Sequence, residues 1–320
     1  MKLPRINSSI FTRAGAVLLL STVSFSASAI DWGGVQGKDI VVFYPGQASW
    51  EWALTQSDHS AAKKFREGKD CIECHTKEEN DIGTKIVSGQ KLEPNPIAGK
   101  PGSVTVNIKT AHDGEKLYVR FEWTEPAAAS GDKKDPDYKA RITMMLDDGH
   151  VAEAKRAGCW GTCHDDAVGM ASAPPGKEIT KYLAQSRSKV TRSGGGENYK
   201  PQADIDKLMS DGMYMEYWQA KIKTDGSAEA ADGYILDKRH KNDAPAVEAQ
   251  IESGGGKTVV TLSRKLTGVG PHHKDLAAGK TYNIGFAIHA DHTDHRYHYV
   301  SFSQTLVLDQ GSADFVAVKK

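Results

Sequence analysis

The four cysteines of the chain fall into two short clusters, and each cluster ends in a histidine. The first reads Cys71-Ile72-Glu73-Cys74-His75, and the second reads Cys159-Trp160-Gly161-Thr162-Cys163-His164. Two thiols followed at once by an imidazole are typical of a covalent haem, because the thiols form thioethers to the vinyl groups while the histidine ligates the iron. The pattern therefore predicts two haem c groups, with His75 and His164 as the proximal iron ligands.

Disulfides and zinc are the competing interpretations of these clusters. A disulfide accounts for paired cysteines but not for the histidine that follows each pair. A zinc module is disfavoured because Cys74 and Cys159 are 85 positions apart, against about 12–20 residues between the pairs of common zinc modules. The second cluster has one residue more than the usual haem spacing, and a positive φ angle at Gly161 would absorb it. A redox disulfide remains the alternative there.

The N-terminal stretch has the pattern of a secretory signal. Residues 1–29 carry three basic residues and no acidic ones, then an apolar run and Ala27-Ser28-Ala29, as expected for export by the general secretory route and cleavage after residue 29. The predicted location is the periplasm, with no transmembrane segment in the mature chain. The whole chain has 41 basic and 41 acidic residues, so nucleic acid is not an expected partner. The mature chain keeps 38 basic against 41 acidic residues.

Residues 30–100 are predicted to form a small helical haem c module. A helix is expected from an N-cap at Asp58 to Glu67, ending at Gly68 and leading the chain to Cys71. His59 lies in its first turn and is a candidate sixth ligand of the first haem, although an exposed histidine near a cap is the simpler alternative. No methionine occurs between Met1 and Met144, which favours two histidine ligands at this iron.

Residues 101–320 have the alternation of β-strands. Residues 104–108 and 117–123 alternate around Asp113-Gly114 and predict a hairpin. Further strands are expected at 141–146, 257–262, 282–289, 298–308 and 315–318, so the predicted fold is mainly β, an antiparallel sandwich that carries the second haem in a loop. Residues 169–203 and 225–245 are expected to be irregular.

Six of the twelve histidines lie between positions 272 and 298. His298 and His289 are the candidate distal ligands of the second haem: the first shares a strand face with core positions, and the second shares one with Gly285 and Ala287, whose small side chains leave room for a macrocycle. Packing against a haem edge is the alternative for both. His292 and His295 are expected to be exposed turn residues. Met170 and the pair Met144-Met145 are further candidate ligands.

Several segments resemble a known family. They are Leu117 to Glu125 (LYVRFEWTE), Ile142 to Asp148 (ITMMLDD), Gly158 to Asp166 (GCWGTCHDD) and His295 to Leu306 (HRYHYVSFSQTL). They resemble the haem-binding domain of ethylbenzene-dehydrogenase-type haem subunits (DMSO reductase family) and their periplasmic c-type relatives. The resemblance implies an immunoglobulin-like β-sandwich related to carbohydrate-binding modules, with haem as an electron-transfer group. The enzyme subunits hold a b haem through Met and Lys; here a covalent motif replaces it, and His298 stands ahead of the VSF segment where the family has Lys.

The expected function is a di-haem electron carrier. Its predicted partners are a membrane-bound quinol-oxidising cytochrome and a periplasmic reductase, which in this family context can contain molybdenum, and the expected setting is anaerobic respiration. The alternative is a haem enzyme, a peroxidase or small-anion reductase, with one open iron and Arg296 and His295 as distal groups. A carbohydrate-binding module using Trp160 or Trp218 is the third possibility, resting on fold analogy alone.

Overall fold

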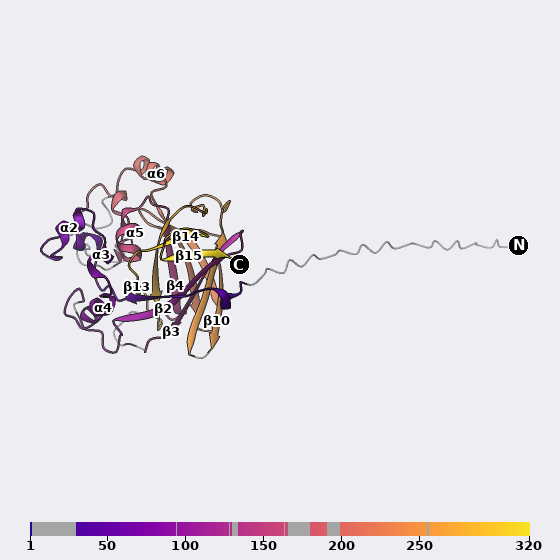
Figure 1. Ribbon diagram of the computed structural model, residues 1–320, viewed down its shortest axis with the longest axis horizontal. Helices are drawn as coiled ribbons and strands as arrows, with labels where there is room; N and C mark the ends of the chain where they lie inside the picture. Colours follow the sequence, from indigo (N-terminus) through magenta and orange to yellow (C-terminus); the bar gives the residue numbers. More distant parts are fainter. Residues whose placement is uncertain are drawn as a thin grey trace.

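The fold is built from β-strands that pack face to face, with short helices gathered toward one end (Figure 1). The computed structural model describes Met1 and residues 30–93, 95–127, 129, 134–162, 164–165, 180–190, 199–254 and 256–320. Within this part of the chain, no helix is both long and apolar enough to cross a membrane. Residues 2–29 of the predicted signal segment, Cys163 and Met170 lie outside the described residues.

The strands are β1 (Lys38–Phe43), β2 (Ser103–His112), β3 (Lys116–Thr124), β4 (Tyr138–Asp147), β5 (His164–Asp165), β6 (Thr180–Lys181), β7 (Met215–Lys223), β8 (Ala228–Ile235), β9 (Arg239–Lys241), β10 (Glu248–Gly254), β11 (Lys257–Lys265), β12 (Tyr282–His289), β13 (Tyr299–Val300), β14 (Gln304–Leu308) and β15 (Phe315–Lys319). The helices are α1 (Trp50–Ala53), α2 (Ala62–Arg66), α3 (Cys71–His75), α4 (Glu79–Val87), α5 (Ala152–Ala157) and α6 (Gln202–Ser210), and the 3-10 turns are η1 (Trp32–Gly34), η2 (Gly158–Gly161) and η3 (Ala184–Ser186).

One large sheet forms the sandwich. Its strand order is β10-β11-β3-β2-β1-β13-β12-β4-β7-β8-β9, and β14 and β15 link β12 back to β2. The pairs in this order are antiparallel, whereas β15 runs parallel to both β14 and β2. Because the sheet turns back on itself, its two halves enclose a core that includes Trp123, Phe121 and Phe286. The predicted β-sandwich fold is confirmed, with two parallel pairings that the alternation of residues does not reveal.

The predicted hairpin is present as β2 and β3. Ile108 pairs with Phe121, and every second residue of β3 is buried, as expected for a strand with one face on the core. The Asp113 carboxylate accepts hydrogen bonds from the backbone of Glu115 and Lys116, at 2.7 Å each. Gly114 takes a φ of +98°, a conformation that glycine adopts without strain. The turn therefore forms where the sequence indicates it.

Other segments differ from expectation. Residues 225–245 are not irregular: they contain β8 and β9. The alanines and the single glycine of β8 give no strand signal, and its order comes from pairing with β7 on one side and β9 on the other. The strand expected over 298–308 is interrupted between β13 and β14. The helix expected from Asp58 begins at Ala62, with Ala61 as an N-cap that makes no side-chain hydrogen bond. The positive φ at Gly68 is as expected for its end.

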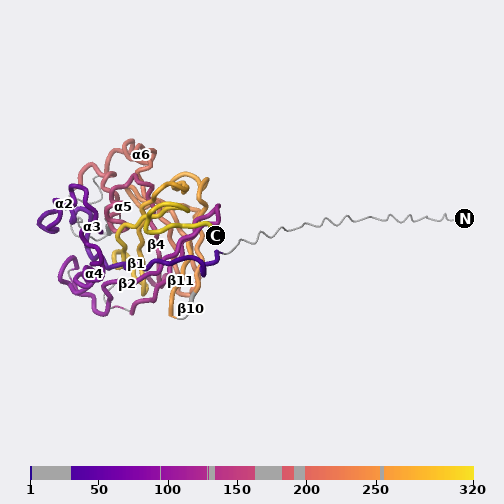
Figure 2. Tube along the Cα trace, in the orientation of Figure 1, coloured from indigo at the N-terminus to yellow at the C-terminus, as the bar shows by residue number. Residues whose placement is uncertain are grey.

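The N-terminal residues contribute to the sandwich as well as to the helices. Strand β1 pairs with β2 along its whole length, and Phe43 pairs with Val300 of β13. The chain then leaves the sheet to form α1 to α4, and α3 lies beside α5 (Figure 2). A second apolar cluster lies between these helices and the sandwich, and Cys71 and Cys159 both belong to it. The two cysteine clusters are thus brought to one region of the fold.

Candidate haem-binding sites

The first cysteine cluster forms helix α3. Asp70 caps it: its carboxylate accepts from the Glu73 backbone at 2.8 Å, and the Glu73 carboxylate accepts from the Asp70 backbone at 3.0 Å. Residues three and four apart share one face of a helix, so Cys71, Cys74 and His75 lie on the same side of α3. Cys71 is buried and Cys74 exposed, and they do not form a disulfide with each other. Burial raises the pKa of the Cys71 thiol to about 12.

The imidazole of His59 faces that of His75. The two ring centroids are 6.2 Å apart and the ring planes differ by 33°. A metal–imidazole bond is about 2.0 Å, and the nitrogen of a five-membered ring with bonds of about 1.35 Å lies about 1.15 Å from the ring centre. Two histidines that ligate one metal from opposite sides therefore have centroids about 6.3 Å apart. The observed separation fits a single iron between the rings.

Each of these rings is oriented through its Nδ1 atom. His75 Nδ1 contacts Glu78 Oε2 at 2.8 Å, and His59 Nδ1 contacts the carbonyl oxygen of Ala53 at 3.0 Å. Neither Nε2 atom has a hydrogen-bond partner among the described residues. A metal-bound histidine uses its second nitrogen in this way, donating to a carboxylate or a carbonyl. The arrangement matches two axial ligands that bind through Nε2.

The surroundings of this histidine pair are aromatic. Trp52 lies 5.4 Å from the His59 ring, and Phe65 lies 6.3 Å from it. The ring of Phe302 is nearly parallel to that of His75 at 6.4 Å. Such apolar walls suit a macrocycle that is itself largely apolar. The residues present at the first motif fit a haem with bis-histidine ligation.

The second cysteine cluster begins in a 3-10 turn. Helix α5 ends at Ala157, and its C-cap residue Gly158, with a φ of +73°, begins η2, which carries Cys159 and Trp160. Gly161 does not have a positive φ; the special conformation occurs at Gly158, before the first cysteine. Only the backbone of His164 is described, in β5, and Cys163 lies outside the described residues. The complete second motif stays a prediction.

A cavity of about 420 Å³ opens beside Cys159. Its volume lies within the range of about 300–1,000 Å³ typical of cofactor pockets. Strands β4, β7 and β12 supply much of its wall, and the lining residues are Arg141, Thr143, Met145, Cys159, Tyr182, Tyr217, Gln219, Lys221, Ile235, Arg239, Ala287, His289, Asp294, His295 and His298. The wall thus places a cysteine of the second motif and both candidate distal ligands around one space. A cavity with these donors fits a haem.

His289 and His298 are neighbours in this cavity. Their ring centroids are 4.7 Å apart, which is too short for two ligands on opposite sides of one iron. Both contact the carbonyl oxygen of His295, His298 through Nδ1 at 2.7 Å and His289 through Nε2 at 2.9 Å. Nδ1 of His289 is buried without a hydrogen-bond partner among the described residues. Burial lowers the pKa of His289 well below its usual value, and the nearby His298 adds to this.

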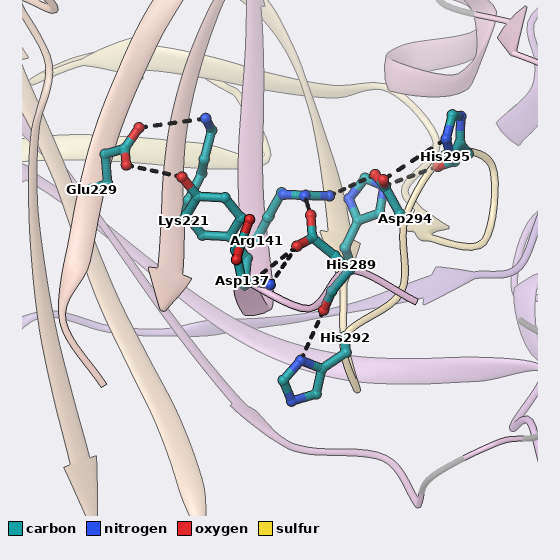
Figure 3. Close-up of polar contacts among 10 residues, drawn as sticks. Asp137, Arg141, Lys221, Glu229, His289, His292, Asp294 and His295 are labelled. Carbon is teal, nitrogen blue, oxygen red and sulfur yellow. Dashed lines mark hydrogen bonds and ion pairs between the residues drawn. The ribbon is translucent and has the colours of Figure 1, made fainter. Parts of the chain in front are cut away.

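Polar groups surround the other side of the cavity. Arg141 forms ion pairs with Asp135 and with Asp294, the latter at 2.8 Å, and Figure 3 shows it beside His289. Lys221 pairs with Glu229 at 3.5 Å. Figure 3 also shows His292 turned away from Arg141. A cavity with apolar and cationic walls suits a group that carries both a hydrophobic ring and carboxylates.

Some residues considered from the sequence lie elsewhere or differ in exposure. Gly285 faces the η2 backbone, because a Cβ there would come within 2.6 Å of the Cys159 nitrogen; of the two small residues, only Ala287 lines the cavity. Met144 is fully buried in the core, whereas Met145 lines the cavity and accepts a hydrogen bond from Thr162 at 3.0 Å. His292 and His295 occupy positive-φ positions in a turn, as expected, but both are half-buried.

Arg296 and Trp218, which the alternative enzyme and sugar-binding functions would use, bond to other residues in the protein interior. Arg296 is buried and donates to the Glu93 carboxylate at 2.6 Å and to the Tyr44 hydroxyl, and it does not line the cavity. Trp218 is fully buried, and its indole donates to Glu216 at 2.5 Å. Neither side chain is placed to contact a substrate or a sugar at the described cavity.

The structure adds residues that sequence reasoning did not identify. Glu78 contacts the proximal His75, and its spacing of three residues from that histidine is the one signal that the sequence offers. Phe302 contacts His75 across 227 positions of sequence. No local pattern indicates such a contact, because it depends on the return of the chain between β13 and β14.

Known proteins of similar sequence identify the family of this chain. The family model described as ethylbenzene dehydrogenase matches residues 76–253, more than half of the sequence. The chain belongs to the ethylbenzene dehydrogenase family. The match begins directly after His75, so it includes the second motif but not the first, and it starts and ends earlier than the segment of roughly 100–320 expected from the resemblance.

Relatives of this family member are cytochromes. Cytochrome c-552 of Stutzerimonas stutzeri is 36% identical over 309 residues, covering 96% of this chain and 97% of the relative. Cytochrome c-551 of Rhodocyclus tenuis is 29% identical over 295 residues, covering 91% and 100%. A carbohydrate binding module family 9 structure from Caldicellulosiruptor kristjanssonii, in complex with cellotriose, overlaps 62% of this chain and 65% of that chain at 9% identity, with a TM-score of 0.28; this likeness is too low to support an argument.

The near full-length likeness settles the general class of this family member. It is a c-type cytochrome with an ethylbenzene-dehydrogenase-type domain, it carries covalently bound haem c, and it acts in electron transfer.

Proposed function

We propose that this cytochrome is an exported, periplasmic di-haem electron carrier. It takes electrons from a membrane-bound quinol-oxidising cytochrome and passes them to a periplasmic terminal reductase of the molybdenum-containing class, in anaerobic respiration. The observation that carries the proposal is the facing pair of His59 and His75, 6.2 Å apart. Haem iron supplies the one-electron chemistry when bound, and the chain's own residues hold and orient it.

At the first site, Cys71 and Cys74 hold the haem covalently, and His75 and His59 supply the two axial nitrogens. Both ligand positions are filled by imidazoles that Glu78 and the Ala53 carbonyl already orient. These ligands then need little rearrangement when the iron changes oxidation state, which suits electron transfer rather than substrate binding. Two histidine ligands also keep the reduction potential lower than a methionine ligand would.

At the second site, Cys159, Cys163 and His164 supply the attachment and the proximal ligand, and we assign His298 as the distal ligand. The 4.7 Å separation of His289 and His298 admits only one of them opposite His164, and their hydrogen bonds support the choice of His298. His298 contacts the His295 carbonyl through Nδ1, the same mode as in His59 and His75. His289 instead uses Nε2 for that carbonyl and packs beside the ligand.

The two sites are close enough in the fold to share packing residues. Phe302 contacts His75 through its ring, and its backbone lies against Gly158, where an added Cβ would be 2.8 Å from the Phe302 carbonyl carbon. Arg156 of α5 contacts the Phe65 ring at 4.2 Å and donates to the Lys69 carbonyl at 3.1 Å. This shared packing supports electron transfer between the two haems within one protein.

The net charge of the mature chain indicates the charge that a partner's docking surface should carry. The mature chain has three more acidic than basic residues, and haem propionates add to the negative charge. Complementary charge accelerates encounter without requiring a large interface. The proposed partners therefore present a basic docking patch, and binding weakens as ionic strength rises.

The test is the intact mass of the denatured, signal-processed protein from a host that attaches haem c. Thioether-bound haem survives unfolding, whereas zinc and b haem do not. Two added haems are expected. One haem at Cys71 and Cys74 alone would refute the di-haem proposal and leave a disulfide at the second motif. The native protein should also show only low-spin spectra and no binding of carbon monoxide; an open iron would favour a haem enzyme instead.

A further inference from the structure

The contact between Glu78 and His75 has a role beyond holding the chain in place. His75 Nδ1 and Glu78 Oε2 are 2.8 Å apart, and both side chains are partly exposed. Since iron takes the Nε2 lone pair of His75 in the proposed site, Nδ1 carries the proton and donates it to the carboxylate. His75 is thus bonded to a negative charge on the side away from the metal.

The turn between α3 and α4 makes this contact. The Glu78 backbone N–H donates to the His75 carbonyl at 3.1 Å, and Lys77 takes a φ of +63° to close the turn. Glu78 is the N-cap residue of α4, but its side chain does not cap that helix. The carboxylate contacts the imidazole of His75 instead. It stays close to the N-terminus of α4, where a negative charge is favourable.

The opposite ligand lacks such a charge. His59 Nδ1 contacts a neutral backbone carbonyl, that of Ala53, at 3.0 Å. The two axial imidazoles of the proposed first haem therefore differ in electron donation, because a carboxylate acceptor makes a ligating histidine more basic than a carbonyl does. A more basic ligand stabilises the oxidised iron.

We propose that Glu78 is a positioning residue for the first haem, one that orients His75 and lowers the reduction potential of the iron through it. This inference rests on the proposed attachment of haem at Cys71 and Cys74. The hydrogen bond to an ionised acceptor is about twice as strong as a neutral one, but partial exposure to solvent weakens the effect of the charge.

The experiment is a redox titration of the full-length cytochrome, followed by EPR and visible spectra, with Glu78→Gln compared with wild type. Glutamine keeps an oxygen that accepts from His75 but removes the charge. We expect the reduction equilibrium of one haem to shift about threefold to tenfold toward the reduced form, about 28–59 mV for one electron. The shifted component is assigned to the first haem by its disappearance as a low-spin signal in His59→Ala.

Glu79→Gln is the matched control, because it removes the same charge one residue away and the Glu79 side chain makes no hydrogen bond or ion pair among the described residues. Its shift should be less than a third of that in Glu78→Gln. Equal shifts in the two variants, with haem attached and low-spin, would overturn the role of Glu78 and leave the electron-carrier proposal standing. Absence of haem at Cys71 and Cys74 in the wild type would overturn both. If Glu78→Gln loses haem, Glu78→Ala replaces it, because alanine removes both the charge and the hydrogen-bond acceptor, and an unchanged potential there would overturn the role.

Discussion

The close approach of η2 to residues 301–303 and to strand β12 gives a prediction whose size follows from the structure. Gly158 has φ +73° and ψ −145°, a region that is essentially reserved for glycine and costs other residues about 1–3 kcal/mol. A Cβ at Gly158 would also come within 2.7 Å of the Ser303 nitrogen, and such overpacking costs about 1–3 kcal/mol. Gly158→Ala should therefore lower the free energy of unfolding by about 2–6 kcal/mol.

Two further variants separate these costs. Gly149 has a φ of +99° with open space around it, so Gly149→Ala should lose only the backbone part, about 1–3 kcal/mol. Gly285 has no positive φ, but a Cβ there would lie 2.6 Å from the Cys159 nitrogen, so Gly285→Ala should lose only the packing part, about 1–3 kcal/mol.

The assay is urea unfolding of the purified cytochrome, followed by far-ultraviolet circular dichroism, together with the haem content of each variant. Gly158→Ala and Gly285→Ala should also attach less haem at the second motif, because Cys159 is displaced in both. Wild-type stability and haem content in Gly285→Ala would refute the packing of η2 on β12. A loss in Gly158→Ala no larger than that in Gly149→Ala would refute the contribution of the Ser303 contact.

Three other outcomes are expected. His59→Ala should convert one haem to a high-spin form that binds carbon monoxide; an unchanged low-spin spectrum would remove His59 from the ligand set. His298→Ala should do the same for the other haem while His289→Ala leaves it low-spin, and the reverse result would exchange their roles. Burial opposes ionisation of Asp232, but hydrogen bonds to its carboxylate outweigh this and lower its pKa. The ionised carboxylate therefore stabilises the fold above the unfolded-state pKa of about 3.9, and this stabilisation is lost as the pH falls through the lower folded-state pKa. Asp232→Asn should flatten the acid side of a plot of unfolding free energy against pH. An unchanged slope would contradict this.

Local chemistry made several features predictable. The cysteine clusters predict their own attachment sites, because two thiols and the adjacent histidine act as one unit on a haem. Helix α3 is set by its capping box, and the hairpin of β2 and β3 follows from alternation and from Asp113 and Gly114. In each case the interacting residues are within a few positions of each other, so the pattern is visible in the sequence.

Other features depend on residues far apart in the chain. Strands β8 and β9 lack a strand pattern. Strand β8 forms because β7 supplies its hydrogen-bond partners, and β9 in turn pairs with β8. The sequence predicts that Gly285 makes room for a macrocycle. Its lack of a side chain instead lets the η2 backbone approach strand β12. Arg296 appeared available as a distal group, but Glu93 pairs with it from 203 positions away.

The sequence by itself predicted which residues attach haem, because the attachment motif is a short run of neighbouring residues. It also determined that the larger part of the chain is a β-sandwich, because apolar and polar residues alternate along many of the strands. Only the tertiary structure decided that His59 lies 6.2 Å from His75, that His289 and His298 are too close to serve one iron together, and that both cysteine clusters adjoin one apolar cluster. These distances arise from the packing of elements against each other, and no short-range pattern encodes them.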